Sequence, residues 1–165
     1  MNRRAFLLAA PGAAALLATA TAVNAECGGP GHGEFVDMTY QKQARLLAEK
    51  TAPNEEEFNS LFSPGMRRLM NTPKRNSKSL FPGPVLNVFF GWGVLPGADI
   101  RVRMLGMVSG DELGPATFGV ETEHRGEKHK ILVHVILEKD EWRIANIIYD
   151  SGRSLLEHYR SITSG

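Results

Sequence analysis

Apolar and polar residues alternate along most of the chain after residue 98, as they do in strands with one buried face. The alternation predicts four consecutive strands that form an antiparallel meander. The last two strands lie within residues 130–149 and are joined at residues 138–141. The apolar positions of the four strands are Ile100, Val102 and Met104, then Ala116, Phe118 and Val120, then Ile131, Val133 and Val135, and finally Trp142, Ile144 and Ile148.

Helical spacing of apolar residues replaces this alternation in the first half of the chain and at its end. We predict a first helix over residues 34–50, a short second helix capped by Asn54, and a third that starts at Ser63 and Pro64. A last helix, over residues 154–162, is expected to pack back on the sheet. The predicted fold class is therefore α+β: N-terminal helices packed on a curved antiparallel β-meander with a short C-terminal helix, in a cone-like arrangement.

The hairpin turns decide which residues face each other across the sheet. A turn at residues 125–128 places His124 opposite His129, and a two-residue turn at residues 139–140 places His134 opposite Ala145. One face then holds the predicted core, which consists of Phe118, Val120, Ile131, Val133, Val135, Leu137, Trp142, Ile144 and Ile148. The opposite face, called the His134 face below, holds Glu121, Leu132, His134, Ile136, Arg143, Ala145, Ile147 and Tyr149. It is half apolar with a few polar groups, which suits a pocket floor or an interface with another chain.

The His134 face carries the candidate catalytic residues. His134 with Glu121 could form a base and the group that orients it, with Tyr149 orienting a ligand. Arg143 could bind a carboxylate or a phosphate. The alternative is structural: His134 is a partly buried histidine, and Glu121 and Arg143 are charges at the rim.

A second candidate binding region is the uncharged segment over residues 82–97, which contains Phe89, Phe90 and Trp92 among glycines and prolines. One interpretation is an apolar lip or partner-binding loop in which Phe90 and Trp92 contact the ligand. The other is a buried strand and turn that complete the core, which is common for apolar runs bounded by Gly and Pro.

Basic residues gather between positions 67 and 78 without an acidic residue among them. They predict either a patch for an anionic group or a solvated helix end, where cations are also favourable. The five residues are Arg67, Arg68, Lys74, Arg75 and Lys78.

The sequence excludes several other kinds of chemistry. A formal charge of +1 does not indicate a nucleic-acid partner. His124 and His129 supply only two ligands beside a turn, too few for a typical zinc site, so we expect no metal. Phosphate-binding and nucleophile motifs are absent, so we expect no cofactor. Cys27 is the single cysteine, which excludes an internal disulfide.

The N-terminus resembles a signal peptide. Residues 1–25 have a basic start, an Ala/Leu-rich run and a small-x-small site that ends at Ala25. We expect cleavage after Ala25, a flexible leader over residues 26–33 and one domain over residues 34–165. The protein would then be periplasmic or secreted, with no transmembrane anchor after cleavage. Arg3-Arg4 resembles a twin-arginine signal; a general secretory signal with two arginines is the alternative.

The order of elements from Glu34 to Ile162 resembles a group of uncharacterised bacterial envelope proteins that are similar to the nuclear transport factor 2-like cone fold. The most specific part of the resemblance is the tryptophan-led last strand, Trp142-Arg143-Ile144, followed by a turn and a closing helix that begins with Ser154-Leu155. Folds of this kind include isomerases, dehydratases, small-ligand binders and interaction modules, so the resemblance alone does not assign a function.

Three functions follow as hypotheses. The first is an exported, non-catalytic domain that binds a small molecule or an envelope protein. The second is a cofactor-free isomerase or lyase with His134 as the general base. The third is an interaction protein that uses the segment around Phe90 and the basic residues after Arg67. A homodimer is expected if helices leave the His134 face uncovered.

Overall fold

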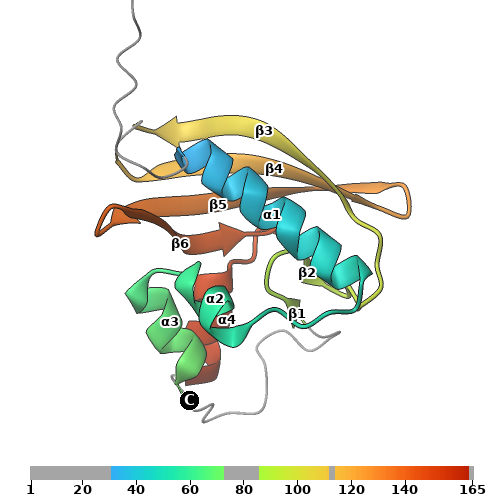
Figure 1. The fold of residues 1–165 in the computed structure, drawn as a ribbon, viewed down its shortest axis with the longest axis horizontal. Coiled ribbons are helices and arrows are strands. Elements are labelled where there is room, and N and C mark those ends of the chain that lie inside the picture. Colours follow the sequence, from blue (N-terminus) through green and yellow to red (C-terminus); the bar gives the residue numbers. More distant parts are fainter. Residues whose placement is uncertain (1–30, 73–85, 112–113, 164–165) are drawn as a thin grey trace, which may run out of the picture.

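Helices followed by a four-stranded antiparallel sheet and a short C-terminal helix make up the computed structural model, which describes residues 31–72, 86–111 and 114–163 (Figure 1). The sheet has the order β3-β4-β5-β6 and is not closed, and the predicted α+β class is confirmed. The elements are α1 (His32–Ala48), α2 (Glu55–Ser60), α3 (Pro64–Asn71), β1 (Leu86–Asn87), β2 (Gly91–Trp92), β3 (Arg101–Gly110), β4 (Ala116–His124), β5 (Glu127–Glu138), β6 (Glu141–Ile148) and α4 (Leu155–Thr163).

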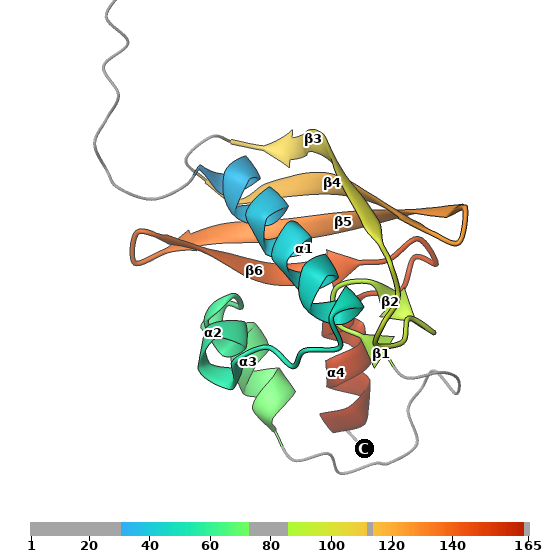
Figure 2. The ribbon, with the colours of Figure 1, turned by 45° about the vertical axis from the view of Figure 1, so that its right-hand side comes forward.

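The core lies between α1 and the face of the sheet that α1 crosses (Figures 1 and 2). Val36 and Tyr40 on α1 are completely buried, as are Val120 and Val133 on the sheet. Burying an aliphatic side chain of this size contributes about 1.5–3 kcal/mol. This packing fixes α1 on the sheet.

The edge of the sheet at β6 is covered by the segment that joins α2 to α3. The Ser63 N–H donates to the Ile144 carbonyl at 2.9 Å, and the Ile144 N–H donates to the Leu61 carbonyl at 2.8 Å. Phe62, between them, is completely buried. Ser63 also caps α3, as predicted, by accepting a hydrogen bond from the Met66 N–H.

α1 begins two residues before the predicted start. His32, which the sequence places in a flexible leader, is helical and lies against Phe118 and Trp142, with ring centroids 4.9 and 5.1 Å apart. Aromatic contacts of this kind hold the first turn on the sheet. The predicted signal peptide and residues 26–30 of the leader lie outside the described residues. In the described part of the chain, no helix has the length and apolar character needed to cross a membrane.

The two hairpin turns are two-residue turns with positive φ angles, the geometry that matches the twist of the strands. The turn at Lys139 and Asp140 is as predicted, with φ angles of 50° and 63°. The other turn is shorter than predicted: Arg125 and Gly126, with φ angles of 53° and 81°, form it. His124 therefore faces Glu127 and not His129. The pairing of β4 with β5 thus differs from the predicted pairing by two residues. Because side chains alternate between faces with a period of two, every β4 and β5 side chain stays on its predicted face.

A bulge between β5 and β6 overturns part of the predicted core. Pairing is regular as far as Val135 opposite Ile144, but His134 then faces Asn146, so Ala145 is the extra residue. After Ala145, each β6 side chain lies on the face opposite to the predicted one. Ile147 is therefore completely buried in the core, whereas Ile148 is half-buried. Tyr149 is likewise buried on the core side.

Leu137 departs from its predicted place for a different reason. It was expected in the core, but 41% of its surface is exposed. It lies beside the Lys139-Asp140 turn, where the sheet extends past α1 (Figure 1).

The bulge predicts unequal effects of neighbouring substitutions. Ile147→Ala should lower the free energy of unfolding by roughly 3–4 kcal/mol, because it leaves a cavity in the core. Ile148→Ala should cost less than half as much, since this side chain is half-buried. Urea unfolding of both variants measures the difference. Regular pairing without the bulge would give the reverse order.

Candidate functional site

His134 lies on β5 between Thr117 of β4 and Asn146 of β6, in place of the predicted Gly119 and Ala145. Its side chain is half-buried on the face opposite the core. Burial lowers the pKa of His134 from its ordinary value of 6.5, because the imidazolium loses solvation. The neutral imidazole is therefore the dominant form at neutral pH.

Glu121 is not brought to His134. It lies four residues along β4 from Thr117, which corresponds to about 13 Å of strand. Its carboxylate pairs with Arg103 at 3.1 Å and with Lys128 at 3.3 Å. Hydrogen bonds from these two residues lower the pKa of Glu121. Glu121 thus belongs to a surface ion-pair cluster and does not orient the histidine.

Tyr149 is on the opposite side of the sheet from His134, because the bulge turns it toward the core. Its hydroxyl donates a 2.7 Å hydrogen bond to the carbonyl of Val88. Burial raises the pKa of Tyr149 well above its ordinary value. The three predicted catalytic residues therefore lie in three separate environments.

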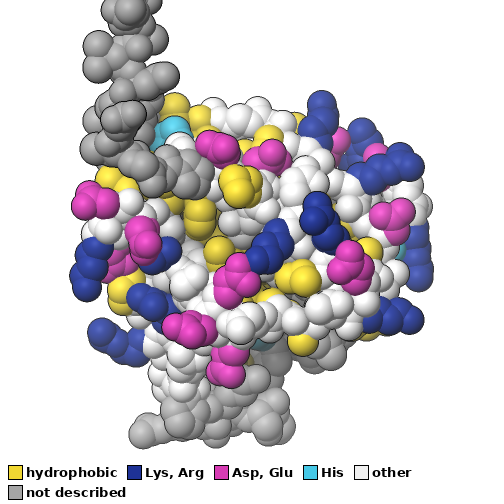
Figure 3. Space-filling view, in the orientation of Figure 1, with side chains coloured by type: hydrophobic (Ala, Val, Ile, Leu, Met, Phe, Trp, Pro, Cys, Tyr) yellow, Lys and Arg dark blue, Asp and Glu magenta, His cyan; other side chains and the backbone are white. Residues whose placement is uncertain are grey.

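Arg143 is half-buried and forms an ion pair with Glu141. Burial lowers the pKa of Arg143, and the nearby positive charge of Arg67 lowers it further. The guanidinium thus already has a carboxylate partner. The rest of the predicted anion patch, Lys74, Arg75 and Lys78, lies outside the described residues. On the face that carries α1, positive and negative side chains are interspersed (Figure 3).

The segment that contains Phe89 and Phe90 is buried, as the core interpretation predicted. Phe89 and Phe90 expose 2% and 8% of their surface. The side chain of Asn87 holds the turn between β1 and β2 by accepting hydrogen bonds from the Phe89 and Phe90 N–H groups at 3.0 and 3.1 Å. The predicted role of the Trp92 side chain falls outside what the structure describes.

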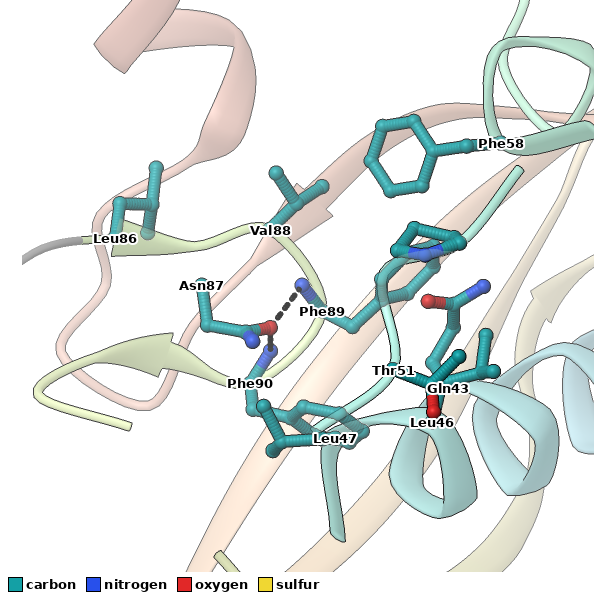
Figure 4. A pocket seen from close by; sticks show the side chains of 11 residues that line it. Gln43, Leu46, Leu47, Thr51, Phe58, Leu86, Asn87, Val88, Phe89 and Phe90 are labelled. Carbon is teal, nitrogen blue, oxygen red and sulfur yellow. Dashed lines mark hydrogen bonds between the residues drawn. The ribbon is translucent and has the colours of Figure 1, made fainter. Parts of the chain in front are cut away.

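These buried rings form the wall of a pocket of about 220 Å³, called the aromatic pocket below. It lies between the C-terminal half of α1, the α1–α2 connection and the β1–β2 turn (Figure 4). Its apolar lining includes Leu46, Leu47, Phe58, Val88, Phe89 and Phe90. Its polar lining consists of Gln43, Thr51 and Asn87, and none of the described residues that line it is charged.

Two hydrogen bonds fix the walls of the aromatic pocket. The hydrogen bond from the Tyr149 hydroxyl to the Val88 carbonyl joins the β1–β2 turn to the end of β6. The Gly97 N–H donates to the Leu47 carbonyl at 2.7 Å, which ties the chain after β2 to the end of α1. Both walls are therefore held by the core and do not depend on a ligand.

A second pocket, also of about 220 Å³, adjoins the first between α1 and α2. It shares Gln43, Pro53 and Phe58 with the aromatic pocket. Lys42 of α1 and Glu57 of α2 line it and form an ion pair with each other. The second pocket thus has an ion pair in an otherwise mostly apolar surface, whereas the described lining of the aromatic pocket is uncharged.

The described residues contain no group of three or more His, Cys, Asp or Glu side chains that could hold a metal ion. His124 Nδ1 lies 3.1 Å from the carbonyl of Asp99, and His129 Nδ1 lies 3.4 Å from the carboxylate of Asp150. Each histidine thus has a separate partner.

Comparison of the chain with protein-family models, curated protein sequences and solved structures gave no match. The function is therefore argued from the pocket and its chemistry. The resemblance to the nuclear transport factor 2-like cone stays a prediction.

Sequence reasoning named Phe90, which lines the aromatic pocket, as a candidate and did not name Gln43. The sequence does contain one signal for Gln43, which is its place in the helix. Gln43 lies four residues after Thr39 and four before Leu47, on the stripe of α1 that faces inward. A glutamine in such a stripe departs from the apolar pattern.

The lowered pKa of His134 predicts a specific pH dependence. The unfolded chain takes up a proton at a higher pH than the folded protein, so protonation favours unfolding. This contribution to stability is complete above the ordinary pKa and is lost as the pH falls through it. Between about pH 7.5 and about pH 5, wild type should lose more stability than His134→Gln. Urea midpoints at both pH values measure this, and parallel losses would contradict the burial of His134.

Proposed function

We propose that this protein is an exported domain that binds a small, neutral, largely apolar molecule in the aromatic pocket without catalysis. The observation that supports this most is the lining of that pocket, where the described residues supply three aromatic rings, several polar groups and no charged side chain. Binding sites for small molecules are commonly concave and apolar, with a few placed polar groups. Export rests on the signal-like residues 1–25.

The volume supports a ligand of about one ring. A dry cavity of about 150 Å³ is known to accept benzene. At about 220 Å³, the aromatic pocket has room for one ring with a short substituent. Larger ligands would have to extend past Gln43, Pro53 and Phe58 into the second pocket.

The alternative, an isomerase or lyase with His134 as base, has less support. Glu121 is paired with Arg103 and Lys128, and Tyr149 is directed to Val88. Neither is available to His134. We therefore retain the binding function as the proposal.

Homodimerisation through the His134 face stays a prediction of the sequence. Exposed apolar residues support it: Leu105 and Val108 are 40% and 56% exposed. Both side chains lie close over Gly119. A Cβ atom added to Gly119 would be 3.2 Å from the Leu105 Cβ and 3.5 Å from the Val108 side chain. Such apolar surface is a common feature of protein contacts.

The binding proposal predicts that filling the aromatic pocket abolishes binding. Leu46→Trp adds a large side chain to the wall of the pocket, and Leu46 is half-buried, so the fold should tolerate it. Saturation-transfer NMR with toluene should detect binding to wild type and a loss of at least about tenfold in affinity for Leu46→Trp.

Leu137→Trp is the matched control, because Leu137 is 41% exposed on the β5–β6 hairpin, away from the pocket. Its affinity should equal that of wild type. Absence of toluene binding to wild type, or equal binding to Leu46→Trp, would refute the proposal.

A further inference from the structure

Gln43 occupies an unusual position for a polar side chain. It is 8% exposed and lines both the aromatic pocket and the second pocket. In Figure 4 its side chain rises from α1 toward Phe89 and Phe58. It therefore lies where a ligand in either pocket would pass.

The amide of Gln43 forms no hydrogen bond within the described part of the chain. Gln41, two residues earlier on α1, shows the contrast: it is exposed, and its amide donates to the Val102 carbonyl at 3.3 Å and to Asp37 at 3.4 Å. The small exposed part of Gln43 includes its amide, which therefore meets solvent in the pockets and is free to bind a ligand. The side chain that the fold leaves unpaired is thus the one that faces the pockets.

We propose that Gln43 recognises the polar group of the ligand, and that the ligand is a neutral aromatic molecule with a carboxamide or a similar group that both donates and accepts hydrogen bonds. This inference rests on the proposed binding function and specifies its ligand class. The glutamine amide offers one acceptor oxygen and a donor NH₂ group, and a second amide complements both.

The surroundings favour a neutral ligand over a carboxylate or an amine. Within residues 31–72, 86–111 and 114–163, no charged residue lines the aromatic pocket. Lys42, in the second pocket, is already paired with Glu57. Removing an unpaired charge from water into such a site is unfavourable, whereas a neutral amide loses less solvation and regains hydrogen bonds.

Asn87 adds a further donor to the aromatic pocket. Its side-chain oxygen accepts from the N–H groups of Phe89 and Phe90, and its NH₂ group donates to no described residue. The Gln43 and Asn87 NH₂ groups are thus both available as donors in the lining, which fits a ligand that contains a carbonyl.

Benzamide, toluene and benzoate test the inference, because they share one ring and differ in the attached group. Wild type should bind benzamide about tenfold more tightly than toluene, as expected for two added hydrogen bonds, and benzoate most weakly. Gln43→Leu should weaken benzamide binding about tenfold and leave toluene binding unchanged. Ligand-observed NMR titration measures all three.

Thermal unfolding separates a recognition role from a structural one. Gln43→Leu removes an amide that forms no hydrogen bond with the described residues, so the Tm without ligand should not fall. A fall in Tm would show that the amide supports the fold and would overturn the inference. Gln43→Met keeps the unbranched shape of glutamine. It gives the same comparison if the branched leucine of Gln43→Leu disturbs α1.

Gln41→Leu is the matched control on the same helix and should leave the ratio of benzamide to toluene affinity at its wild-type value. An unchanged ratio in Gln43→Leu, with toluene still bound, would overturn the inference and leave the proposed function intact. Failure of wild type to bind any of the three compounds would overturn both.

Discussion

The buried ring of Phe89 is the contact on which the arrangement around the pocket depends. It lies against Tyr40 of α1, Phe58 of α2 and Phe62 beside β6, with ring centroids 5.5, 5.9 and 5.9 Å away. Segments far apart in the sequence thus meet at one side chain. Aromatic pairs add about 0.5–1.5 kcal/mol each to the effect of burial, so this cluster fixes the β1–β2 turn on the core. The same ring also forms part of the wall of the aromatic pocket, which couples the pocket to the fold.

The fold class could be predicted from the sequence because the periodicity of apolar residues is strong. The strands from Ala116 to Ile144 have their predicted faces, and Asn54 and Ser63 cap the helices as expected. The bulge at Ala145 could not be predicted, because both registers place apolar residues inward: Ile148 in one and Ile147 in the other. The two registers differ in packing, since only the bulged one lets Tyr149 reach the Val88 carbonyl from the core side. That hydrogen bond joins residues 61 positions apart, so no local pattern reports it.

The candidate site was predicted less well than the fold, for a related reason. His134 attracted attention as a titratable residue among apolar ones, but chemistry at a site requires convergence in space. Glu121 shares a sheet face with His134 yet lies in another part of it, and the bulge removes Tyr149 from that face. Phe90 could be named as a candidate because an uncharged aromatic run stands out in the sequence. Gln43 could not be found by such a search, since its significance depends on burial and on the lack of a partner.

Tyr40 and Gln43, two buried residues of α1 whose polar groups have no described partner, differ in what they imply. The Tyr40 hydroxyl is buried without a partner, but it belongs to a ring that packs on Phe89 and Phe90, and burial raises the pKa of this tyrosine. The large ring offsets the cost of the hydroxyl, so packing alone accounts for Tyr40. Gln43 has no ring and brings no comparable apolar surface. Packing therefore does not account for a polar side chain on this inward-facing stripe, and proteins commonly depart from local rules of this kind at functional sites. A role in ligand recognition explains the position of Gln43 better than a role in the core.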